Sequence, residues 1–355
     1  MGKGFAITTD LNLGEMLLAG YARHCSTPST EPANKPSEGT SSKLLPSIRV
    51  AAITNDTVAT FVSLAYAVKT APKSRVAMGL IVGTGTNATV PMRPSKLHPD
   101  KQSQLRDLSA TDTVVINTEW TIRGTDEPLD ALGIKTKWDR ILDENSDAPG
   151  FQPFEYMTSG RYLGEIVRLA FVDSLANEMN TEAIPNSLQN KNAIPTWFLS
   201  EVVARSDKAT LPLKLEEQCP AINSADGTFW TPARAQRLCD LAQAVQQRSS
   251  ALIGAASIGL LGCVGEVDLA GSSAAQAEGH SRTPNLASDV DELVIAYTGG
   301  TISQYPHWLE DCQAWIDKIV AASTTRPGMQ VVLKEALDGG IIGAGVLAGM
   351  GSSIL

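Results

Sequence analysis

The sequence predicts an α/β fold, in which buried strands alternate with helices. Residues 48–53 (I-R-V-A-A-I) and 76–82 (V-A-M-G-L-I-V) are apolar runs with the length of a buried strand. A helical pattern follows the first run over 58–64. Two further runs, 293–297 and 331–333, have the same character towards the C-terminal end. Strands separated by helical segments in this way are typical of α/β domains.

The length and composition are those of a globular protein with a large core. The chain has 355 residues, of which 43% are apolar, and this allows one large domain or two smaller ones. The formal net charge is −9, and no dense run of Lys or Arg interrupts the acidic balance. The acidic balance argues against a nucleic-acid-binding surface, so we expect no nucleic acid partner.

The cysteines and histidines give no indication of a metal centre. The five cysteines lack a C-x-x-C pair and the four histidines lack ligand spacing, so we expect no protein metal site. An odd number of scattered cysteines fits a reducing compartment and argues against a disulfide framework. The cysteines are Cys25, Cys219, Cys239, Cys263 and Cys312.

Two apolar stretches are too short to span a membrane. Residues 251–264 and 341–350 are built largely from small side chains and fall below the roughly 18 apolar residues of a transmembrane helix. Buried, closely packed helices are the better interpretation. The first residues lack the apolar core of a signal peptide. The predicted location is therefore the cytoplasm, with no membrane partner.

Helices and low-complexity segments are predicted along the rest of the chain. Residues 11–24 have helical apolar spacing, whereas 25–47 are rich in Ser, Thr, Pro, Glu and Lys and predict a disordered surface insertion. Thr231 and Pro232 suit the cap and first position of a helix that leads to Val264, and 266–290 is a second low-complexity loop.

A long helix is predicted over 158–179 because its apolar residues recur with helical spacing. Its apolar face would carry Leu163, Ile166, Val167, Ala170 and Phe171.

Polar residues follow the first two predicted strands and can carry chemistry there. Asp56 comes just after 48–53, and the turn 83–87 (G-T-G-T-N) follows 76–82. Ligands of open α/β sheets bind beyond such strand ends. A carboxylate beside a Gly-Thr loop suits phosphoryl transfer to a hydroxyl, because the carboxylate accepts the proton and the loop holds phosphate oxygens. Taken alone, Asp56 fits a helix N-cap better than a catalytic base.

Four blocks of sequence carry a family resemblance. Residues 53–60 read I-T-N-D-T-V-A-T, 79–88 read G-L-I-V-G-T-G-T-N-A, 116–120 read I-N-T-E-W, and 149–165 read P-G-F-Q-P-F-E-Y-M-T-S-G-R-Y-L-G-E. In this order they resemble the I-N-D-T-V-G-T, G-L-I-x-G-T-G-T-N-A, I-N-T-E-W and P-G-x-Q-x-F-E-K-M-x-S-G-x-Y-L-G-E segments of eukaryotic hexokinases. The resemblance is close over 48–169 and looser from there to Leu355.

The resemblance implies the actin-like ATPase/sugar-kinase fold, an α/β fold with a ribonuclease-H-like large domain. Residues 1–74 would be the remnant of a truncated hexokinase small domain, with 25–47 as its insertion. Residues 75–355 would be the hexokinase large domain. The last helix, which follows 338–340 (D-G-G), would pack back against the small domain.

The resemblance also implies a catalytic residue and a sugar-binding shell. Asp56 matches the residue that takes the proton from the sugar 6-hydroxyl. Amides and carboxylates suit the shell because each can pair with two vicinal hydroxyls. Without the resemblance, each of these residues is more typical of a cap or a surface position. The residues that match hexose-binding positions are Lys3, Asn55, Asn87, Glu119 and Glu155.

A further set of residues matches the nucleotide half of the family's site. Thr84 matches a hydroxyl that contacts the transferred phosphate, and the glycines on either side allow close backbone approach. Residues 298–300 and 338–340 match D-G-S turns around the adenosine pocket, with an ordinary tight turn as the alternative. The implied cofactors are ATP and its accompanying Mg²⁺. The predicted nucleotide-binding residues are Gly83, Thr84, Gly85, Thr298, Gly299, Gly339 and Gly340.

The chain also departs from the family pattern. It shows no match to the N-terminal phosphate-binding hairpin (L-D-x-G-G-T-x-x-R) or the S-F-P segment, and Tyr156 and Thr298 replace a lysine and an aspartate. The late segments 297–301 and 338–349 resemble diverged fungal members. Two functions remain: ATP-dependent phosphorylation of a glucose-like hexose at O6, or a non-catalytic sugar sensor that acts through a protein partner.

Overall fold

The computed structural model describes most of the chain. The described residues are 12–25, 45–68, 73–105, 113–120, 125–176, 178, 184–221, 229–269, 290–323 and 328–351. Lys3, most of the predicted insertion 25–47 and most of the predicted loop 266–290 lie outside these residues.

A sheet and its surrounding helices make up the described residues. The strands are β1 (Ser74–Val82), β2 (Thr86–Met92), β3 (Val114–Asn117), β4 (Glu292–Thr298) and β5 (Gln330–Glu335). The helices before β4 are α1 (Leu13–Cys25), α2 (Asp56–Val68), η1 (Pro94–Lys96), α3 (Pro99–Gln102), α4 (Asp126–Ala131), α5 (Lys137–Glu144), α6 (Pro153–Thr158), α7 (Leu163–Leu175), α8 (Asn186–Gln189), α9 (Thr196–Phe198), η3 (Leu199–Val203), α10 (Leu211–Gln218) and α11 (Pro232–Val264). The helices after it are α12 (Gly300–Gln304), α13 (Trp308–Ser323) and α14 (Gly339–Gly351).

The strands form one mixed sheet in the order β3-β2-β1-β4-β5. β1 and β2 form an antiparallel hairpin, β3 pairs antiparallel with β2, and β4 and β5 run parallel to β1. The middle of β1 is apolar without alternation because helices cover both of its faces. The carboxyl ends of β1, β4 and β5 therefore meet at one edge of the sheet.

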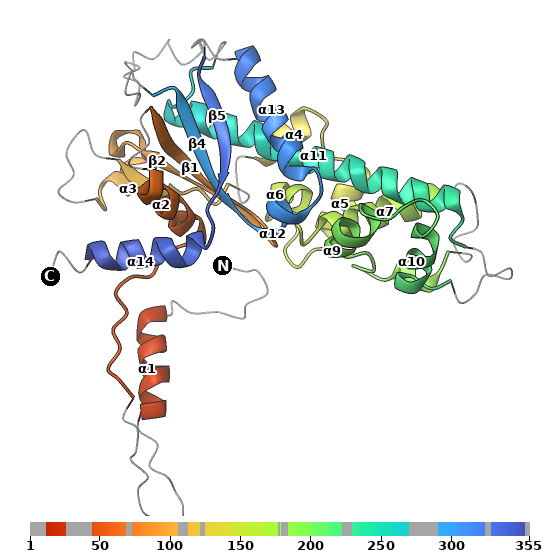
Figure 1. Ribbon diagram of the computed structural model, residues 1–355, viewed down its shortest axis with the longest axis horizontal. Coiled ribbons are helices and arrows are strands. Elements are labelled where there is room, and N and C mark those ends of the chain that lie inside the picture. The colour runs from red at the N-terminus through yellow and green to blue at the C-terminus, as the bar shows by residue number, and fades with distance from the viewer. Residues whose placement is uncertain are drawn as a thin grey trace, which may run out of the picture.

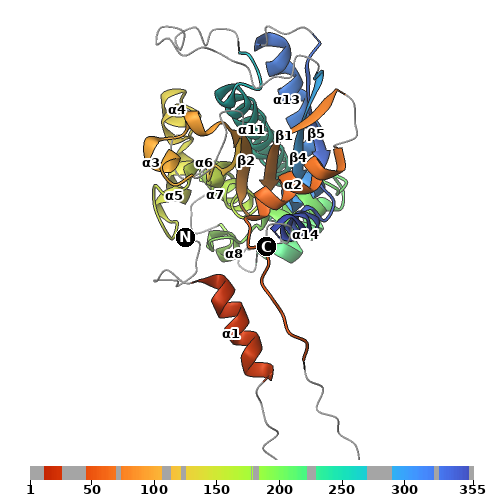
Figure 2. The ribbon, with the colours of Figure 1, turned by 90° about the vertical axis from the view of Figure 1, so that its left-hand side faces the viewer.

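Helices cover both faces of the sheet (Figures 1 and 2). α2 and α14 lie on one face, while α11 and α13 lie on the other. Phe61 packs with Val76 and Val294 in a small core beneath α2, and the larger core fills the opposite face. Beyond the sheet, α5, α7, α9 and α10 lie along the rest of α11 (Figure 1). Helix α1 lies apart from this body in both views.

The predicted strand over 48–53 is wrong. These residues have no regular secondary structure, and Ile48 and Ile53 are exposed. An apolar run becomes a strand only when a neighbouring strand pairs with it. Among the described strands, none pairs with this segment.

The predicted helix over 158–179 is also wrong in its extent. α6 ends at Thr158 and α7 runs from Leu163 to Leu175. The break arises because Ser159 is extended and the Gly160 amide donates to the Gly83 carbonyl, at 2.7 Å, instead of to a helical carbonyl. The residues predicted for the apolar face are all buried, which confirms that face.

The remaining predicted strands and the helix α11 are confirmed. Thr231 caps α11 by accepting a hydrogen bond from the Arg234 amide at 3.3 Å, and Gly265 ends it in the left-handed region. The strand β2 was not predicted, because its sequence (T-N-A-T-V-P-M) has no continuous apolar run. Pro91 is tolerated there because the pairing of β2 with β1 ends at Thr89.

α14 packs against α2 through glycines. A Cβ on Gly343 would collide with the Ala59 carbonyl, and one on Gly339 would lie 3.2 Å from the Thr60 Cα. The two apolar stretches noted in the sequence lie in α11 and α14. Among the described helices, none combines the length and apolar character that crossing a bilayer requires.

Candidate functional site

The turn between β1 and β2 is a tight loop that hydrogen bonds hold in place. The Gly83 amide donates to the Gly85 carbonyl at 2.9 Å. The Gly83 carbonyl accepts from the Gly160 amide at 2.7 Å and from the Thr301 hydroxyl at 3.0 Å. A Cβ on Gly160 would collide with Thr301. Thr84, at the tip of the loop, is exposed and can meet a ligand.

Polar side chains gather on β2 and β3, close to this loop. Asn87 Nδ2 donates to Asn117 Oδ1 at 2.7 Å and to Glu119 Oε1 at 3.1 Å. Asn117 Nδ2 donates to the same Glu119 oxygen at 2.9 Å. Glu155 is buried in α6 and accepts from the Thr86 amide at 3.2 Å. The structure thus brings together Asn87, Glu119 and Glu155, three of the residues predicted to bind a hexose.

Glu119 has a backbone conformation that is rare for its residue type. Its φ is 44°, in the left-handed region. The next residue, Trp120, is buried and packs edge to face on Phe154 with ring centroids 5.5 Å apart. Glu119 and Glu155 each adjoin one of these rings in the sequence, so the ring contact brings the two chain segments that carry them together. Strained backbone of this kind is characteristic of positions that orient a side chain for function.

Asn55 and Asp56 form the N-terminus of α2. The Oδ1 atoms of both side chains accept from the Thr57 amide at 2.9 Å. Capping is therefore a role that these residues do fill, as the sequence alone suggested. The Asp56 side chain remains exposed, so its carboxylate is open to a ligand as well.

The sheet register places this helix end over the polar cluster. Gly79 lets α2 approach β1, since a Cβ there would lie 2.7 Å from the Thr57 carbonyl oxygen. Gly79 pairs with Thr89 on β2, and Thr89 pairs with Asn117 on β3. The start of α2 therefore lies on the strands that carry Asn87 and Asn117.

A cavity of about 380 Å³ opens beside the glycine loop. Its size falls within the range of small-molecule sites. Two of the residues that line the cavity differ in exposure: the Trp197 side chain is 58% exposed, whereas Thr301 is buried. An exposed aromatic ring and a glycine loop on one cavity lining suit a ligand with a planar part and an anionic part. The lining includes Gly83, Thr84, Arg161, Thr196, Trp197 and Tyr305.

The other residues predicted to bind nucleotide are placed differently. Gly299 has φ 125° and packs directly on the Val82 carbonyl and the Gly83 amide, where a side chain would collide. Gly299 thus packs against the start of the glycine loop. Gly339 packs against α2, and Gly340 is exposed. Thr298, Gly85, Gly339 and Gly340 are not among the described residues that line the cavity.

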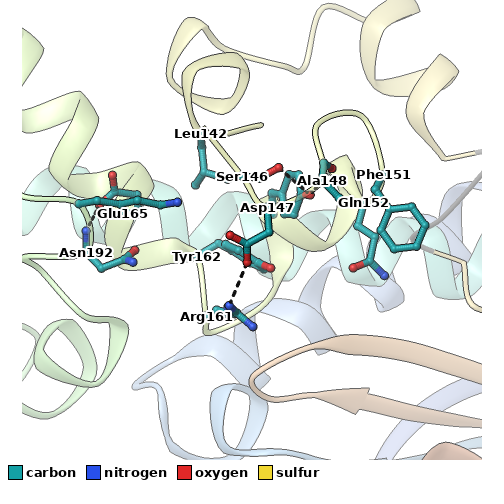
Figure 3. A pocket seen from close by; sticks show the side chains of 12 residues that line it. Leu142, Ser146, Asp147, Ala148, Phe151, Gln152, Arg161, Tyr162, Glu165 and Asn192 are labelled. Atoms are coloured by element: carbon teal, nitrogen blue, oxygen red, sulfur yellow. Dashed lines mark hydrogen bonds and ion pairs between the residues drawn. The ribbon is translucent and has the colours of Figure 1, made fainter. Parts of the chain in front are cut away.

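A second cavity of about 210 Å³ shares part of its lining with the first, and Figure 3 shows the side chains around it. Arg161, Glu165 and Asn192 line both cavities. Burial raises the pKa of Tyr162 to about 12, so its ring stays neutral beside Arg161. Burial also raises the pKa of Tyr156, whose hydroxyl lies 3.2 Å from the Ala148 carbonyl oxygen.

Some site residues were not predicted from the sequence. Asn117 stands two positions before Glu119 in the block I-N-T-E-W, and this period-two spacing was a usable signal. Trp197 and Arg161 carried no signal, because only the fold places them beside the glycine loop. Within the described residues, no group of three or more His, Cys, Asp or Glu side chains is arranged to hold a metal ion.

The mixed sheet with helices on both faces, and the glycine loop after β1, fit an actin-like ATPase/sugar-kinase fold. The comparison with family models agrees, since the model described as Hexokinase matches residues 77–350. The chain belongs to the hexokinase family.

Similar proteins include hexokinases of animals and plants. Human Hexokinase-3 is 36% identical over 214 residues, which cover 59% of this chain and 20% of that protein. Hexokinase-1 of Oryza sativa subsp. japonica is 29% identical over 312 residues, which cover 85% of this chain and 53% of that protein. The chain thus spans about half, or less, of the length of these relatives. The likeness of its late segments to fungal members stays a prediction.

Solved structures support the fold. A hexokinase from Schistosoma mansoni complexed with glucose superposes with a TM-score of 0.63 and 25% identity, covering 84% of this chain and 57% of that one. A second hexokinase crystal structure gives a TM-score of 0.58 at 21% identity, covering 84% of this chain and 55% of that one.

Proposed function

We propose that this chain phosphorylates a glucose-like hexose at O6, with ATP as the phosphoryl donor. The observation that carries the proposal is the hydrogen-bonded cluster of Asn87, Asn117 and Glu119, with Glu155 bound to the adjoining backbone. Carboxylates and amides held in this way can pair with adjacent sugar hydroxyls. The glucose complex of the Schistosoma mansoni hexokinase, a structural neighbour, supports the choice of sugar.

In the proposed site, the hexose lies between this cluster and the start of α2. Asn87, Glu119 and Glu155 would bind its hydroxyls, with Asn55 from the helix end and Lys3 completing the shell. The Asp56 carboxylate is exposed at the same helix end and would face O6.

The proposed transfer needs a base and a hold on the phosphate. The O6 oxygen attacks the γ-phosphorus, its proton passes to Asp56, and the bond from the γ-phosphorus to the bridging oxygen breaks to release ADP. Thr84 and the amides of the glycine loop would contact the transferred phosphate. Bound Mg²⁺ would neutralise charge on the phosphates, and it would arrive with the nucleotide.

A sugar sensor without phosphoryl transfer is the second candidate. The observation that favours it is the contrast between the two halves of the site. The residues proposed to bind the sugar are joined by hydrogen bonds. In the proposed nucleotide half, Thr298 stands at a position where the family has an aspartate. The described lining of the larger cavity there contains Arg161 and no other Lys or Arg. Such a sensor would act through a protein partner.

Two further points stay predictions: the division of the chain into 1–74 and 75–355, and the cytoplasmic location.

One paired experiment separates the two functions. Glucose is titrated into the protein while tryptophan fluorescence is recorded, because Trp120 adjoins Glu119 and reports on it. ATP-dependent formation of glucose 6-phosphate is then measured on the same sample. Asp56→Asn is the matched variant, since Asn caps a helix as well as Asp does but is a far weaker base.

The outcomes are distinct. Turnover that Asp56→Asn abolishes while glucose binding persists establishes the kinase. Saturable glucose binding with no turnover in either protein leaves the sensor. Absence of both signals, in a protein that unfolds cooperatively, contradicts both functions.

A further inference from the structure

The cavity beside the glycine loop contains a single described cation. Arg161 is the one Lys or Arg among the described residues that line it. A nucleotide triphosphate is highly anionic, and charge-assisted hydrogen bonds to phosphate are among the strongest that a side chain can make. Arg161 was not among the residues that the sequence predicted for this site.

The backbone of Arg161 is held against the loop. The Gly160 amide donates to the Gly83 carbonyl at 2.7 Å, and the Thr301 hydroxyl donates to the same oxygen at 3.0 Å. Any side chain at position 160 would collide with Thr301. Arg161 directly follows Gly160, so the hydrogen bond between Gly160 and Gly83 fixes the Arg161 Cα close to the loop that carries Thr84.

The guanidinium group is held much more loosely. Its ion pair with Asp147 spans 3.8 Å, and both side chains are largely exposed, at 46% and 73%. Figure 3 shows these two side chains pointing toward one another at the second cavity. The guanidinium also lies over the Tyr162 ring, 5.7 Å from its centroid. Exposed pairs of this length contribute little stability, so a phosphate can compete with Asp147.

The carboxylate that shares this lining does not oppose a phosphate. Glu165 accepts two hydrogen bonds from Arg168, at 2.8 Å and 2.6 Å, and one from the Asn192 amide at 2.6 Å. Its charge is compensated by Arg168, which is buried beside it. Arg161 is therefore the group whose charge is available to a ligand.

We propose that Arg161 binds the phosphates of the nucleotide. On binding, its guanidinium would leave the ion pair with Asp147 and form hydrogen bonds to phosphate oxygens instead. Because Arg161 lines both cavities, a rotation of its side chain carries the guanidinium from Asp147 to the Gly83–Thr84 end of the larger one. Asp147 acts as the holding partner in the empty site. This inference rests on the proposed nucleotide binding at that cavity.

Calorimetric titration with ATP, ADP and adenosine tests the inference without relying on turnover. We expect Arg161→Gln to weaken ATP and ADP binding about tenfold and to leave adenosine and glucose binding unchanged. Arg161→Lys should restore part of the loss. Asp147→Asn should strengthen ATP binding by about threefold, and this gain should vanish when Arg161→Gln is also present.

Each other result overturns the role of Arg161. Unchanged ATP binding in Arg161→Gln, or an equal loss for adenosine, would show that Arg161 does not act on phosphate. A wild-type protein that binds glucose but none of the three nucleotides would overturn the proposed kinase function together with this inference. Normal nucleotide binding that is insensitive to Arg161 would overturn the inference alone.

Discussion

At the scale of single residues, the proposed sugar site depends on two carboxylates, Glu119 and Glu155, that hydrogen bonds hold in place. Glu155 is 1% exposed, and the Thr86 amide donates to it. Glu119 is held by two amide side chains and by its own strained backbone. Neither carboxylate is an ordinary surface residue, which was the alternative interpretation of both from the sequence.

Glu155→Gln should weaken glucose binding by about tenfold or more, because a charged acceptor becomes a neutral amide in a buried position. Titration by tryptophan fluorescence measures the dissociation constant. Glu127→Gln is the matched control, since Glu127 lies exposed on α4. An affinity for glucose that is equal in the two variants would remove Glu155 from the sugar site.

At the scale of elements, the polar cluster depends on how helices approach the sheet. Gly79 brings α2 onto β1, and Gly343 brings α14 onto α2. The contact at Gly79 lets the polar start of α2 lie close to the strands, and the contact at Gly343 packs α14 against the same turn of α2. Helix packing on this face therefore positions the proposed base.

Gly343→Ala should lower the free energy of unfolding by about 1–3 kcal/mol, because the added methyl group meets the Ala59 carbonyl. The matched control is Gly345→Ala in the same helix, where a Cβ has no neighbour within 4 Å. That control should be neutral or stabilising by up to about 1 kcal/mol. Urea denaturation of both variants measures the difference, and equal stabilities would contradict the packing described for α14.

A carboxylate links three strands and gives a pH-dependent contribution to stability. The Lys334 ammonium, together with the Ser74 hydroxyl, lowers the pKa of Glu292 from its usual 4.5. A lowered pKa means that the folded state favours the ionised form. The stabilisation is therefore present above about pH 4.5 and is lost as the pH falls through the folded-state value.

Glu292→Gln should consequently cost up to about 1 kcal/mol at pH 7, since the pair is partly exposed. The difference in stability between the variant and the wild type should shrink as the pH falls from about 7 to about 3. Urea unfolding at both pH values tests this. A difference that grows as the pH falls would contradict the direction of the shift.

The sequence predicted most of the strands of the sheet, because a buried strand can be recognised in the sequence as a short apolar run. It failed at β2, which is polar and joins the sheet through the hairpin with β1. It also failed at 48–53, where an apolar run has no strand beside it in the described part of the chain. For the candidate site, family motifs predicted Asn87, Glu119 and Glu155, which the structure brings together. Arg161 and Trp197 lie near the loop through tertiary contacts that the sequence does not reveal.

At the scale of the whole molecule, one buried ion pair joins the long helix to the helical region beside the sheet. Arg248 of α11 makes two hydrogen bonds to Asp139 of α5, at 2.7 Å and 2.8 Å. Asp139 also completes the capping box of α5 with Thr136. The same carboxylate therefore supports both the start of one helix and its attachment to another.

Arg248→Gln should destabilise the protein by about 3 kcal/mol or more, because it leaves the Asp139 carboxylate buried without its cation. Lys137→Gln on the same helix is the control: its pair with Asp173 is exposed, so its loss should cost less than about 1 kcal/mol. Thermal or urea unfolding measures both. Adding Asp139→Asn to Arg248→Gln should cost less than the sum of the single changes, and full additivity would contradict the coupling.

Helix α11 has 33 residues, so at 1.5 Å per residue it is about 50 Å long. It runs beneath the sheet at one end and beside α7 and α10 at the other (Figure 1). An uninterrupted helix bends only gently, and this one contains no proline after its first residue. The consequence is mechanical: one stiff helix, α11, connects the sheet with the helical region that contains α7 and α10. Slow collective motions of the protein should therefore pivot at connections outside this helix, and not at the break between α6 and α7, where the hydrogen bond from Gly160 to Gly83 holds the chain.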